Sequence, residues 1–561
     1  MAFIVKKKIH GKNYYYLNEN KRVEGKVKSK TLAYLGKTKK EAEKKSKEII
    51  QKLKEESAME LNQGTSNETD KKPEGEELLK RQDISIEDLT TFCKRKGFVY
   101  QSGDIYGGFA GFWDFGPLGV ELKNNLKEDW WNYFVGRDDV VGIDGSIITH
   151  PKIWKASGHV DSFSDVFILC KKCKKPGKVD RNELGKVNCA HCGGDYDEST
   201  ARDFKLMFET NVGQDDTSYL RPETAQMIFV DFKSVYDNSR AKLPFGIAQI
   251  GKAFRNEIAP RDFLFRSREF EQMEMQYFIN PEKLDDCPFY EDIKNEKINI
   301  LDSEKKEDVL SIGQMLKKKI FRNKWHAYWL HYSYLWFLKL GIDKDNLRLR
   351  EHEKDELAHY ANAAVDIEYN FPTGWREIFG SHDRGDFDLS QHEEFSRKEL
   401  KVFDEESKKK VLPKVIESSF GVERAFLAFM FDSYFYGDQR KNIVLKLNPV
   451  LSPIKAAVFP IVKVNEEIVK ISKDVYDNLR KEFSVVYDSG GSVGRRYSRN
   501  DEIGTPFCIT VDEKSLKSMD VTIRDRDSKK QIRVKVSELK NVLRGLINGE
   551  INFDKVGKVG K

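Results

Sequence analysis

Residues 254–274 combine arginines, carboxylates and an aromatic residue at regular spacing. The segment begins with Phe254-Arg255-Asn256-Glu257 and, after a short loop, places Arg266, Phe270 and Glu274 four residues apart. If both flanks are extended strands, side chains two or four residues apart share one face. Arg255 then pairs with Glu257, and the other three residues form a row. Arginines can clamp phosphates, an aromatic ring can stack on a base, and carboxylates can accept an amine or a metal.

The same segment has a simpler interpretation, an amphipathic hairpin whose charged residues pair on a solvated face. In either case Met273, Met275 and Tyr277 suit a packed opposite face. A second segment favours the nucleotide site. Residues 417–424 are predicted to run from an extended stretch into an apolar helix over Ala425 to Phe431, with Arg424 in its first turn. Gly421 permits close backbone approach at that junction.

Four cysteines form the strongest local signal in the chain. Cys170 and Cys173, then Cys189 and Cys192, make two C-x2-C pairs separated by 15 residues. Thiolates at this spacing bind zinc tetrahedrally, and four of them leave no position open for water, so a structural zinc site is predicted. The alternatives are four unmetallated thiols, or a site that uses His191 as a ligand.

The bulk composition predicts a cytoplasmic protein of roughly three or four domains. Its 561 residues are 39% hydrophobic and 34% charged, and no apolar run reaches the length of a membrane span. The first nine residues contain three lysines and lack the apolar core of a secretion signal. Seven cysteines, four of them clustered, indicate metal binding in a reducing compartment rather than a disulfide framework.

Positive charge is concentrated at the N-terminus. Residues 1–56 hold 16 lysines and Arg22 against seven acidic residues, a local charge of +10, so the rest of the chain sums to −4. A basic appendage on a mildly acidic body suits a polyanion, most simply RNA. A solvated lysine-rich arm is the alternative.

Residues 254–274 and 417–424 resemble motifs 2 and 3 of class II aminoacyl-tRNA synthetases. The Pro117 region is similar to motif 1, which shapes the dimer interface in that family. A plain turn between a strand and a helix is the alternative for Pro117. The run Arg221-Pro222-Glu223-Thr224-Ala225-Gln226 further resembles the glycyl-tRNA synthetase family, in which the glutamate holds the substrate ammonium. Taken alone, the run also suits a helix start with Pro222 at the first position. One departure from the family is Ser418, where a proline is usual.

The resemblance implies an ATP-dependent glycine–tRNA ligase that forms glycyl-adenylate and transfers glycine to tRNA-Gly, with Arg255 and Arg424 as catalytic arginines. The implied ATP-binding residues are Arg255, Asn256, Glu257, Phe265, Arg266, Ser267, Arg268, Phe270, Glu377, Ile378, Gly421 and Arg424. The implied glycine-binding residues are Glu223, Phe270, Glu274, Glu417 and Ser419. Glu377 would hold Mg²⁺. A small acidic pocket suits glycine, which is selected by crowding out larger side chains.

The expected fold class is α+β. Residues 1–61 are predicted to form a basic β/α appendage with strands over 3–9, 14–17 and 30–35 and a helix over 39–61, and 62–82 a linker. A class II antiparallel-sheet core is expected over 83–445, with a zinc-knuckle insertion at 166–200 and a variable insertion at 282–365. An α/β anticodon-binding domain follows at 446–553, and 554–561 form a tail.

Two other functions fit parts of the sequence. A catalytically inactive paralogue could keep the fold as a nucleic-acid-binding accessory subunit, although such proteins tend to lose the motif arginines, which are all present. A class II enzyme of threonyl or prolyl specificity would share the C-terminal domain, but the Glu223 motif and the acidic pocket argue against it. The expected partners are tRNA-Gly, glycine, ATP and a second copy of the chain, with no membrane.

Overall fold

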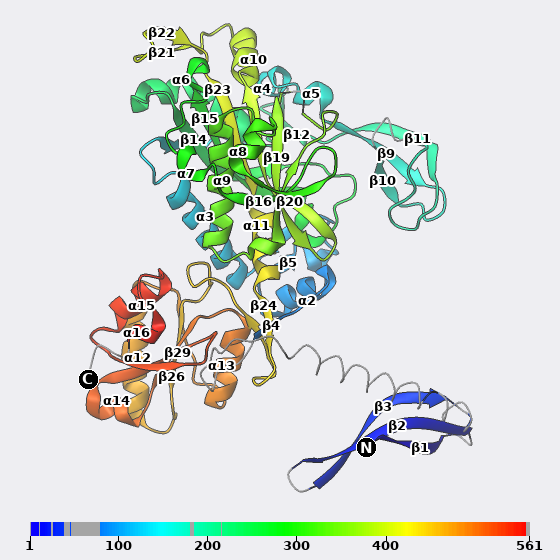
Figure 1. Cartoon of the computed structure of the whole chain (residues 1–561), viewed down its shortest axis with the longest axis vertical. Coiled ribbons are helices and arrows are strands. Elements are labelled where there is room, and N and C mark those ends of the chain that lie inside the picture. Colours follow the sequence, from blue (N-terminus) through cyan, green and yellow to red (C-terminus); the bar gives the residue numbers. More distant parts are fainter. Residues whose placement is uncertain are drawn as a thin grey trace. The chain divides into compact units, whose positions relative to one another are not determined.

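The computed structural model describes residues 2–9, 12–23, 26–36, 38, 45, 79–179, 184–214, 216–358 and 360–556 (Figure 1). The chain divides into two units, Met1–Gly75 and Glu76–Lys561. The first holds a three-stranded antiparallel sheet of β1 (Ala2–Ile9), β2 (Lys12–Val23) and β3 (Lys26–Gly36). The three predicted strands are confirmed, and β2 and β3 are longer than expected. The predicted helix over 39–61 lies, apart from Lys45, outside the described residues.

The second unit is organised around a nine-stranded sheet in the order β17-β16-β18-β19-β20-β23-β15-β14-β7. All pairs are antiparallel except β14–β7 and β16–β18. The strand bounds are β7 (Val140–Gly142), β14 (Phe245–Phe254), β15 (Glu269–Ile279), β16 (Lys297–Leu301), β17 (Glu307–Ser311), β18 (Leu347–Glu351), β19 (Ala363–Phe371), β20 (Gly374–Gly385) and β23 (Lys414–Gly421). The antiparallel core expected from the sequence is therefore present, and β16 to β18 extend one edge of it.

Strand β15 separates an apolar core from a polar pocket. Its residues Met273, Met275 and Tyr277 are 0–1% exposed, as predicted, and the Tyr277 ring centroid lies 4.7 Å from that of Trp329. Gln272 and Glu274, on either side of Met273, point to the other face, because successive strand side chains alternate. This alternation places polar side chains in the centre of the sheet.

Helices cover both faces of the sheet. On the apolar face lie α3 (Pro117–Phe134), α9 (Lys324–Lys339) and α11 (Val422–Asp432), whereas α6 (Ala225–Ser239) packs on the other face, where its Phe229 and Phe232 contact Phe278. Helix α9 packs on β20 and β23, and α11 packs on β15 and β23. The ring of Phe420 contacts both Trp130 of α3 and Trp336 of α9, at centroid distances of 5.9 and 5.3 Å. Helix α11 starts directly where β23 ends, as predicted, so Arg424 lies in its first turn.

Smaller sheets flank the main one. One of them, β10-β9-β11, carries the four cysteines and consists of β9 (Ser164–Cys170), β10 (Pro176–Val179) and β11 (Tyr196–Lys205). The others contain β4 (Leu79–Arg81), β5 (Val99–Gln101), β6 (Trp113–Phe115), β8 (Ile148–Thr149), β12 (Glu209–Val212), β13 (Asp216–Leu220), β21 (Val402–Asp404), β22 (Lys409–Val411), β24 (Tyr434–Gly437) and β25 (Asn442–Leu445). The prediction of a linker through residue 82 is wrong at its end, because β4 pairs with β24.

The C-terminal part has its own five-stranded sheet, β27-β26-β28-β29-β30, and its own apolar core. Its strands are β26 (Ala456–Pro460), β27 (Val485–Tyr487), β28 (Phe507–Val511), β29 (Asp520–Asp525) and β30 (Gln531–Lys535). Its helices are α12 (Glu466–Leu479), α13 (Val493–Glu502), α14 (Glu513–Ser518), α15 (Leu539–Ile547) and α16 (Phe553–Val556). The strand-helix-strand order predicted from the sequence is confirmed.

Short helical segments complete the unit: α2 (Ile86–Lys96), η1 (Asp104–Tyr106), α4 (Pro151–Ala156), α5 (His159–Ser162), η3 (Phe263–Phe265), η4 (Pro281–Lys283), α7 (Tyr290–Ile293), α8 (Ile312–Lys317), η5 (Lys344–Asn346) and α10 (Phe387–Ser396). None of the helices formed by the described residues is both long and apolar enough to cross a membrane.

Candidate functional site

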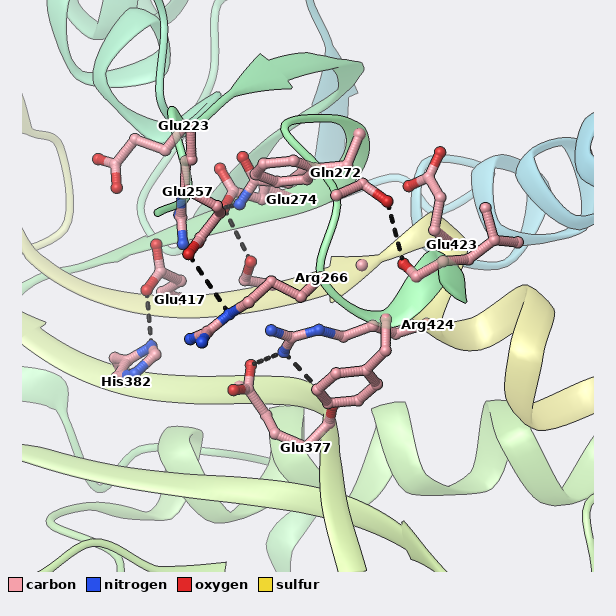
Figure 2. Close-up of a pocket in the computed structure, with 18 of the residues that line it drawn as sticks. Glu223, Glu257, Arg266, Gln272, Glu274, Glu377, His382, Glu417, Glu423 and Arg424 are labelled. Atoms are coloured by element: carbon pink, nitrogen blue, oxygen red, sulfur yellow. Dashed lines mark hydrogen bonds and ion pairs between the residues drawn. The ribbon is translucent and has the colours of Figure 1, made fainter. Parts of the chain in front are cut away.

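The polar faces of β15, β20 and β23 and the start of α11 enclose a pocket, called the central pocket below (Figure 2). It is lined by Glu223, Arg255, Glu257, Leu264, Phe265, Arg266, Ser267, Phe270, Gln272, Glu274, Tyr360, Glu377, Gly380, His382, Arg384, Glu417, Ser419, Gly421, Glu423 and Arg424. Segments from residue 223 to residue 424 thus converge on one cavity.

Most of the predicted site residues line the central pocket, and three do not. The side chain of Ile378 is 0% exposed and belongs to the core. The backbone N–H of Asn256 donates to the carbonyl of Leu206, at 2.7 Å. Arg268 donates from its guanidinium to the carbonyls of Glu257 and Ala110, at 3.0 and 3.1 Å. Arg268 therefore shapes the loop next to the pocket rather than its wall.

Two arginines of the pocket are paired with carboxylates. Arg266 Nε lies 3.4 Å from Glu257 Oε2, and Arg424 Nη1 lies 2.9 Å from Glu377 Oε1 (Figure 2). The expected pair of Arg255 with Glu257 is wrong, because β14 ends at Phe254 and the alternation of side chains does not continue past it. Arg255 Nε instead donates to the carbonyl of Pro222, at 3.0 Å.

Aromatic rings lie against Arg255 and Arg424. The guanidinium of Arg255 is 5.3 Å from the ring centroid of Phe270, and that of Arg424 is 4.7 Å from the centroid of Phe265. Cations over ring faces at this distance are attracted by the ring quadrupole. One end of the central pocket therefore combines flat apolar surfaces with arginine charges, a combination that suits a purine nucleotide and its phosphates.

The other end of the pocket is acidic and deeply buried. Glu223, Glu274 and Glu417 are only 7%, 2% and 3% exposed. Glu274 accepts hydrogen bonds from Thr224 Oγ1 at 2.5 Å, from Gln272 Nε2 at 2.9 Å and from Ser419 Oγ at 2.8 Å. Three donors fix the orientation of this carboxylate without neutralising it.

A buried arginine balances part of the negative charge. Arg384 donates to both carboxylate oxygens of Asp388 at 2.8 Å, and its Nη1 lies 3.1 Å from Glu417 Oε1. His382 Nδ1 lies 2.7 Å from the other oxygen of Glu417. Glu417 is thus the best compensated of the three pocket glutamates, whereas no arginine or lysine pairs with Glu223 or Glu274 among the described residues.

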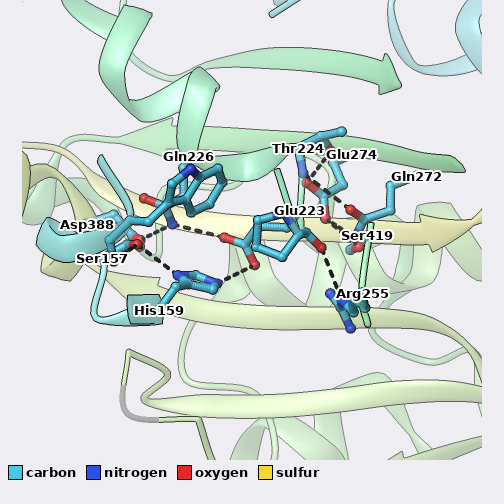
Figure 3. A network of polar contacts seen from close by, with 12 residues as sticks. Ser157, His159, Glu223, Thr224, Gln226, Arg255, Gln272, Glu274, Asp388 and Ser419 are labelled. Carbon is cyan, nitrogen blue, oxygen red and sulfur yellow. Dashed lines mark hydrogen bonds and ion pairs between the residues drawn. The ribbon is translucent and has the colours of Figure 1, made fainter. Parts of the chain in front are cut away.

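A network of polar side chains contacts the carboxylate of Glu223 and fixes its position (Figure 3). His159 Nε2 lies 3.3 Å from Glu223 Oε2, and the other ring nitrogen of His159 lies 2.8 Å from Ser157 Oγ. Gln226 Nε2 donates to Glu223 Oε1 at 3.0 Å and to Asp388 Oδ1 at 2.9 Å. The alternative of a helix beginning at Pro222 is not observed, because α6 begins at Ala225 and leaves Glu223 in the loop before it.

Burial and neighbouring charges give the three glutamates different proton affinities. Burial raises the pKa of Glu274 to about 7, and the nearby carboxylates of Glu417 and Glu223 add to the rise. Against the cost of burial, Arg384 and then His382 lower the pKa of Glu417 to about 2. His159 similarly keeps the pKa of Glu223 well below its usual range. A cation entering the pocket would therefore bind most favourably beside Glu274, which lacks a countercharge.

The class II synthetase core model, described for the enzymes G, H, P, S and T, matches residues 204–434, and the anticodon-binding domain model matches residues 455–546. Curated relatives extend this match. Glycine–tRNA ligase of Borrelia hermsii is 43% identical over 472 residues, which cover 82% of this chain and 97% of that protein. The chain belongs to the glycine–tRNA ligase family.

Other members of the glycine–tRNA ligase family match equally broadly. The enzymes of Acetivibrio thermocellus and Geobacillus kaustophilus are each 42% identical, over 82% of this chain and 98% of their own length. A crystal structure of prolyl-tRNA synthetase from Cryptosporidium parvum shares the fold, with a TM-score of 0.51 at 14% identity, and covers 87% of this chain and 80% of its own. Family membership establishes the activity as glycine–tRNA ligation, which uses ATP, an amino acid and tRNA as substrates.

The N-terminal unit has a separate match. Residues 4–65 match the model of the N-terminal domain of IS1634 family transposases. This match covers strands β2 and β3 and strand β1 from Ile4 onward, and it lies outside both of the synthetase models.

Several pocket residues were not predicted from the sequence of this glycine–tRNA ligase family member. Gln272 lies two residues before Glu274 on β15, so strand alternation could have identified it. His382 and Arg384 share a strand face with Gly380, and all three line the pocket. Strand alternation over residues 380–384 could have predicted that His382 and Arg384 share a face. Tyr360 comes from a loop, and no local pattern places it; the centroid of its ring lies 3.7 Å from the Arg384 guanidinium.

The four cysteines come together as predicted. Their sulfur atoms all lie within 4.8 Å of one another, with Cys170–Cys192 and Cys173–Cys189 separations of 3.5 and 3.7 Å. Zn–S bonds of about 2.3 Å in a tetrahedron place sulfurs about 3.8 Å apart, so this donor set fits zinc. His191 is not part of the cluster and instead contacts Lys175.

Proposed function

We propose that the arginine end of the central pocket binds ATP for glycine activation. Arg255 would hold the α-phosphate and the glycine carboxylate, Arg424 the γ-phosphate, and Glu257 the adenine amino group. Phe270 and Phe265 would flank the base and the bent phosphates. These assignments are supported by the pairing of Arg266 with Glu257 and of Arg424 with Glu377. ATP phosphates can take the place of the carboxylate beside each arginine, and the adenine amino group can take the place of the arginine beside Glu257.

The acidic end would bind glycine. Glu223, Glu274 and Glu417 surround the site with three buried carboxylates, and of these only Glu417 forms a direct ion pair with Arg384. Ser419 would fix Glu274 through its 2.8 Å hydrogen bond. A short, buried and acidic end can hold an ammonium firmly while leaving little room for a side chain, which is the selection that glycine requires.

Metal ions have two proposed positions. Glu377 offers a carboxylate at the mouth of the pocket, and Mg²⁺ commonly binds one or two carboxylates together with substrate phosphates. The cysteine cluster would hold zinc and fix the fold of the sheet around it. Bound Mg²⁺ would supply charge neutralisation for the phosphates, while Arg255 and Arg424 orient them.

The reaction then needs positioning more than proton transfer. The glycine carboxylate attacks the α-phosphorus of ATP and pyrophosphate leaves, and later the terminal ribose hydroxyl of tRNA attacks the activated carbonyl. Holding the two anions in line and neutralising them can supply several kcal/mol to the transition state. This role of Arg255 is supported by its hydrogen bond to the carbonyl of Pro222, the residue before Glu223, and by its position 5.3 Å from the Phe270 ring centroid.

The observation that carries these assignments is the separation, within one pocket, of the arginines that lie against aromatic rings from the three buried glutamates. Substitutions at the two ends should therefore have separate effects in glycine-dependent ATP–pyrophosphate exchange. Arg424→Ala should raise the KM for ATP with little change for glycine, and Glu223→Gln should do the reverse. Equal effects on both substrates would contradict the assignment, and complete absence of exchange in the wild type would favour the inactive paralogue.

We also propose a homodimer formed around the Pro117 region, in a reducing, cytoplasmic setting that keeps the clustered thiols able to bind metal. Light scattering of the purified chain tests the dimer. A monomer at micromolar concentration that is fully active would contradict it.

For the N-terminal unit we propose RNA binding. It combines a three-stranded antiparallel sheet with a local charge of +10 and matches the N-terminal domain of a transposase family. Truncation at about Gly75 should weaken the apparent tRNA affinity at low salt more than at moderate salt, because phosphate contacts depend on salt. Unchanged affinity at low salt would contradict RNA binding.

A further inference from the structure

The carboxylates at the acidic end of the central pocket cannot select glycine by themselves. Every amino acid with a primary amine carries the same α-ammonium group, so Glu223, Glu274 and Glu417 would attract glycine and alanine alike. Discrimination against a methyl group needs a fixed surface in the space that the methyl would occupy. A carbon-rich side chain beside the glutamates can supply such a surface.

Tyr360 supplies a carbon-rich surface at this end. It lines the central pocket, and its ring centroid lies 3.7 Å from the guanidinium carbon of Arg384 and 6.3 Å from the centroid of the His382 ring. Arg384 and His382 are also the two basic residues that contact the carboxylate of Glu417. The Tyr360 ring therefore lies next to the partners of one of the three pocket glutamates.

The two phenyl rings of the pocket lie elsewhere. Phe270 lies 5.3 Å from the guanidinium of Arg255, and Phe265 lies 4.7 Å from that of Arg424. These rings accompany the arginines that are assigned to ATP. Tyr360 is thus the aromatic wall on the side of the glutamates.

The electrostatic neighbours of the Tyr360 hydroxyl agree with this position. Burial raises the pKa of the hydroxyl, and the carboxylates of Glu417, Glu223 and Asp388 add to the rise, although the charge of Arg384 opposes it. The phenol is therefore neutral at physiological pH, and it adds bulk to the acidic end without adding a further negative charge.

The ring is held against a cation that cannot move. Arg384 is 1% exposed, donates to both carboxylate oxygens of Asp388 at 2.8 Å and lies 3.1 Å from Glu417. A cation over a ring face is attracted by the ring quadrupole. Because Arg384 is fixed by two carboxylates, the face of Tyr360 that rests on it is fixed as well.

The backbone before and after Tyr360 is also anchored. Arg350 Nη2 donates to both carboxylate oxygens of Glu356 at 2.6 Å. Asn362 donates from its side chain to Asp383 Oδ1 at 3.0 Å and from its backbone N–H to the carbonyl of Asp383 at 2.7 Å. A larger substrate would have to displace an anchored loop, and forcing extra volume into a packed site is unfavourable.

We propose that Tyr360 is a specificity-determining residue whose ring fills the space that a side chain on the substrate α-carbon would need. This inference rests on the proposed binding of glycine at the acidic end. The two α-hydrogens of glycine point in different directions once its ammonium and carboxylate are held. A single ring can therefore block only one of them, so Tyr360 excludes one enantiomer of alanine.

ATP–pyrophosphate exchange with glycine, L-alanine and D-alanine tests the inference. Tyr360→Ala removes the wall, and Tyr360→Phe keeps the ring. The matched control is Tyr476→Ala, because Tyr476 is a partly exposed tyrosine of α12 that does not line the central pocket. Thermal melting checks that each variant is folded, and Tyr360→Leu, which keeps an apolar side chain on Arg384, is the second opening variant if Tyr360→Ala does not fold.

Tyr360→Ala should raise kcat/KM for one enantiomer of alanine, relative to that for glycine, by roughly 10–100-fold, the usual discrimination for one methyl group. Tyr360→Leu should show a smaller gain for the same enantiomer. Tyr360→Phe and Tyr476→Ala should keep the wild-type ratios within about twofold, since the first retains the wall and the second lies far from it.

Two results would overturn the role of Tyr360. Unchanged ratios with lower rates for all three amino acids would show a purely structural residue, and equal gains for both enantiomers would show a general loosening of the pocket. Failure of glycine binding itself would be visible separately. Wild-type exchange that glycine does not stimulate, or a KM for glycine that Glu223→Gln leaves unchanged, would contradict the assignment of the acidic end whatever the alanine ratios.

Discussion

Ser419 Oγ donates a 2.8 Å hydrogen bond to Glu274 Oε1 across the pair of strands β15 and β23, where the two residues are register partners. Because the backbone ladder fixes both side chains, Glu274 is held in one orientation before any ligand enters. Pre-organisation of this kind reduces the ordering that binding would otherwise require.

Removing the hydroxyl of Ser419 should therefore weaken glycine binding. A hydrogen bond to a charged group contributes about 1.5–3 kcal/mol, so Ser419→Ala should raise the KM for glycine by roughly 10–100-fold. The control is Ser418→Ala on the same strand. Ser418 is 0% exposed, and its hydroxyl has no hydrogen-bond partner among the described residues, so its loss should leave the KM unchanged. Equal effects of the two variants in ATP–pyrophosphate exchange would contradict the role of Ser419.

Glycine binding should depend on pH through Glu274. Burial and the adjacent carboxylates raise the pKa of this group to about 7, and an ammonium binds the ionised form. The KM for glycine should thus fall roughly tenfold between pH 6 and pH 8 and then level off. The KM for ATP serves as the internal control, because Glu274 lies at the other end of the pocket. A KM for glycine that does not change with pH would show that Glu274 is ionised throughout.

The same carboxyl should reduce stability at higher pH. The pKa of Glu274 is higher in the folded chain than its ordinary value of 4.5. The stabilisation of the folded state by the bound proton is therefore complete below pH 4.5 and is lost as the pH rises through about 7. Glu274→Gln removes this dependence. The free energy of unfolding of the Glu274→Gln variant, measured in denaturant, should therefore increase relative to that of the wild type between pH 6 and pH 8. A difference that stays constant, or that moves the other way, would argue against a raised pKa.

His159 is expected to act as a positioning residue for Glu223. Its ring lies 3.3 Å from one carboxylate oxygen and is held by Ser157. Loss of one of the two contacts of Glu223 should let the carboxylate rotate, so His159→Ala should lower kcat/KM for glycine about tenfold, a loss of about 1.4 kcal/mol, with the KM for ATP unchanged. Gln can still donate to Glu223, and His159→Gln should recover part of the loss. No recovery, together with a lower melting temperature, would indicate a purely structural role.

Strand alternation predicted one wall of the site well. The apolar row of Met273, Met275 and Tyr277 required the intervening residues to face the pocket, and the structure places Glu274 there. Alternation failed at Arg255 and Glu257 because the strand ends at Phe254, before both of them, and the loop conformation then decides which partner each side chain meets.

Other parts of the site depend on contacts between distant segments. Arg384 is 33 residues from Glu417 in the sequence, and only the pairing of β20 with β23 brings them together. The Glu223–His159 contact joins a loop before α6 to a short helix 64 residues earlier, and neither segment has a local pattern that predicts it. The sequence could identify the chemistry of the glutamates, whereas their proton affinities follow from tertiary neighbours.

The most direct test of the account is ATP–pyrophosphate exchange by the purified chain, measured with glycine, alanine, serine, threonine and proline at equal concentrations. The three buried glutamates and the confined acidic end predict strong exchange with glycine, and rates with the other four amino acids at least about a hundredfold lower, since each added group must displace a fixed wall. Exchange stimulated by threonine or proline but not by glycine would contradict the proposed pocket.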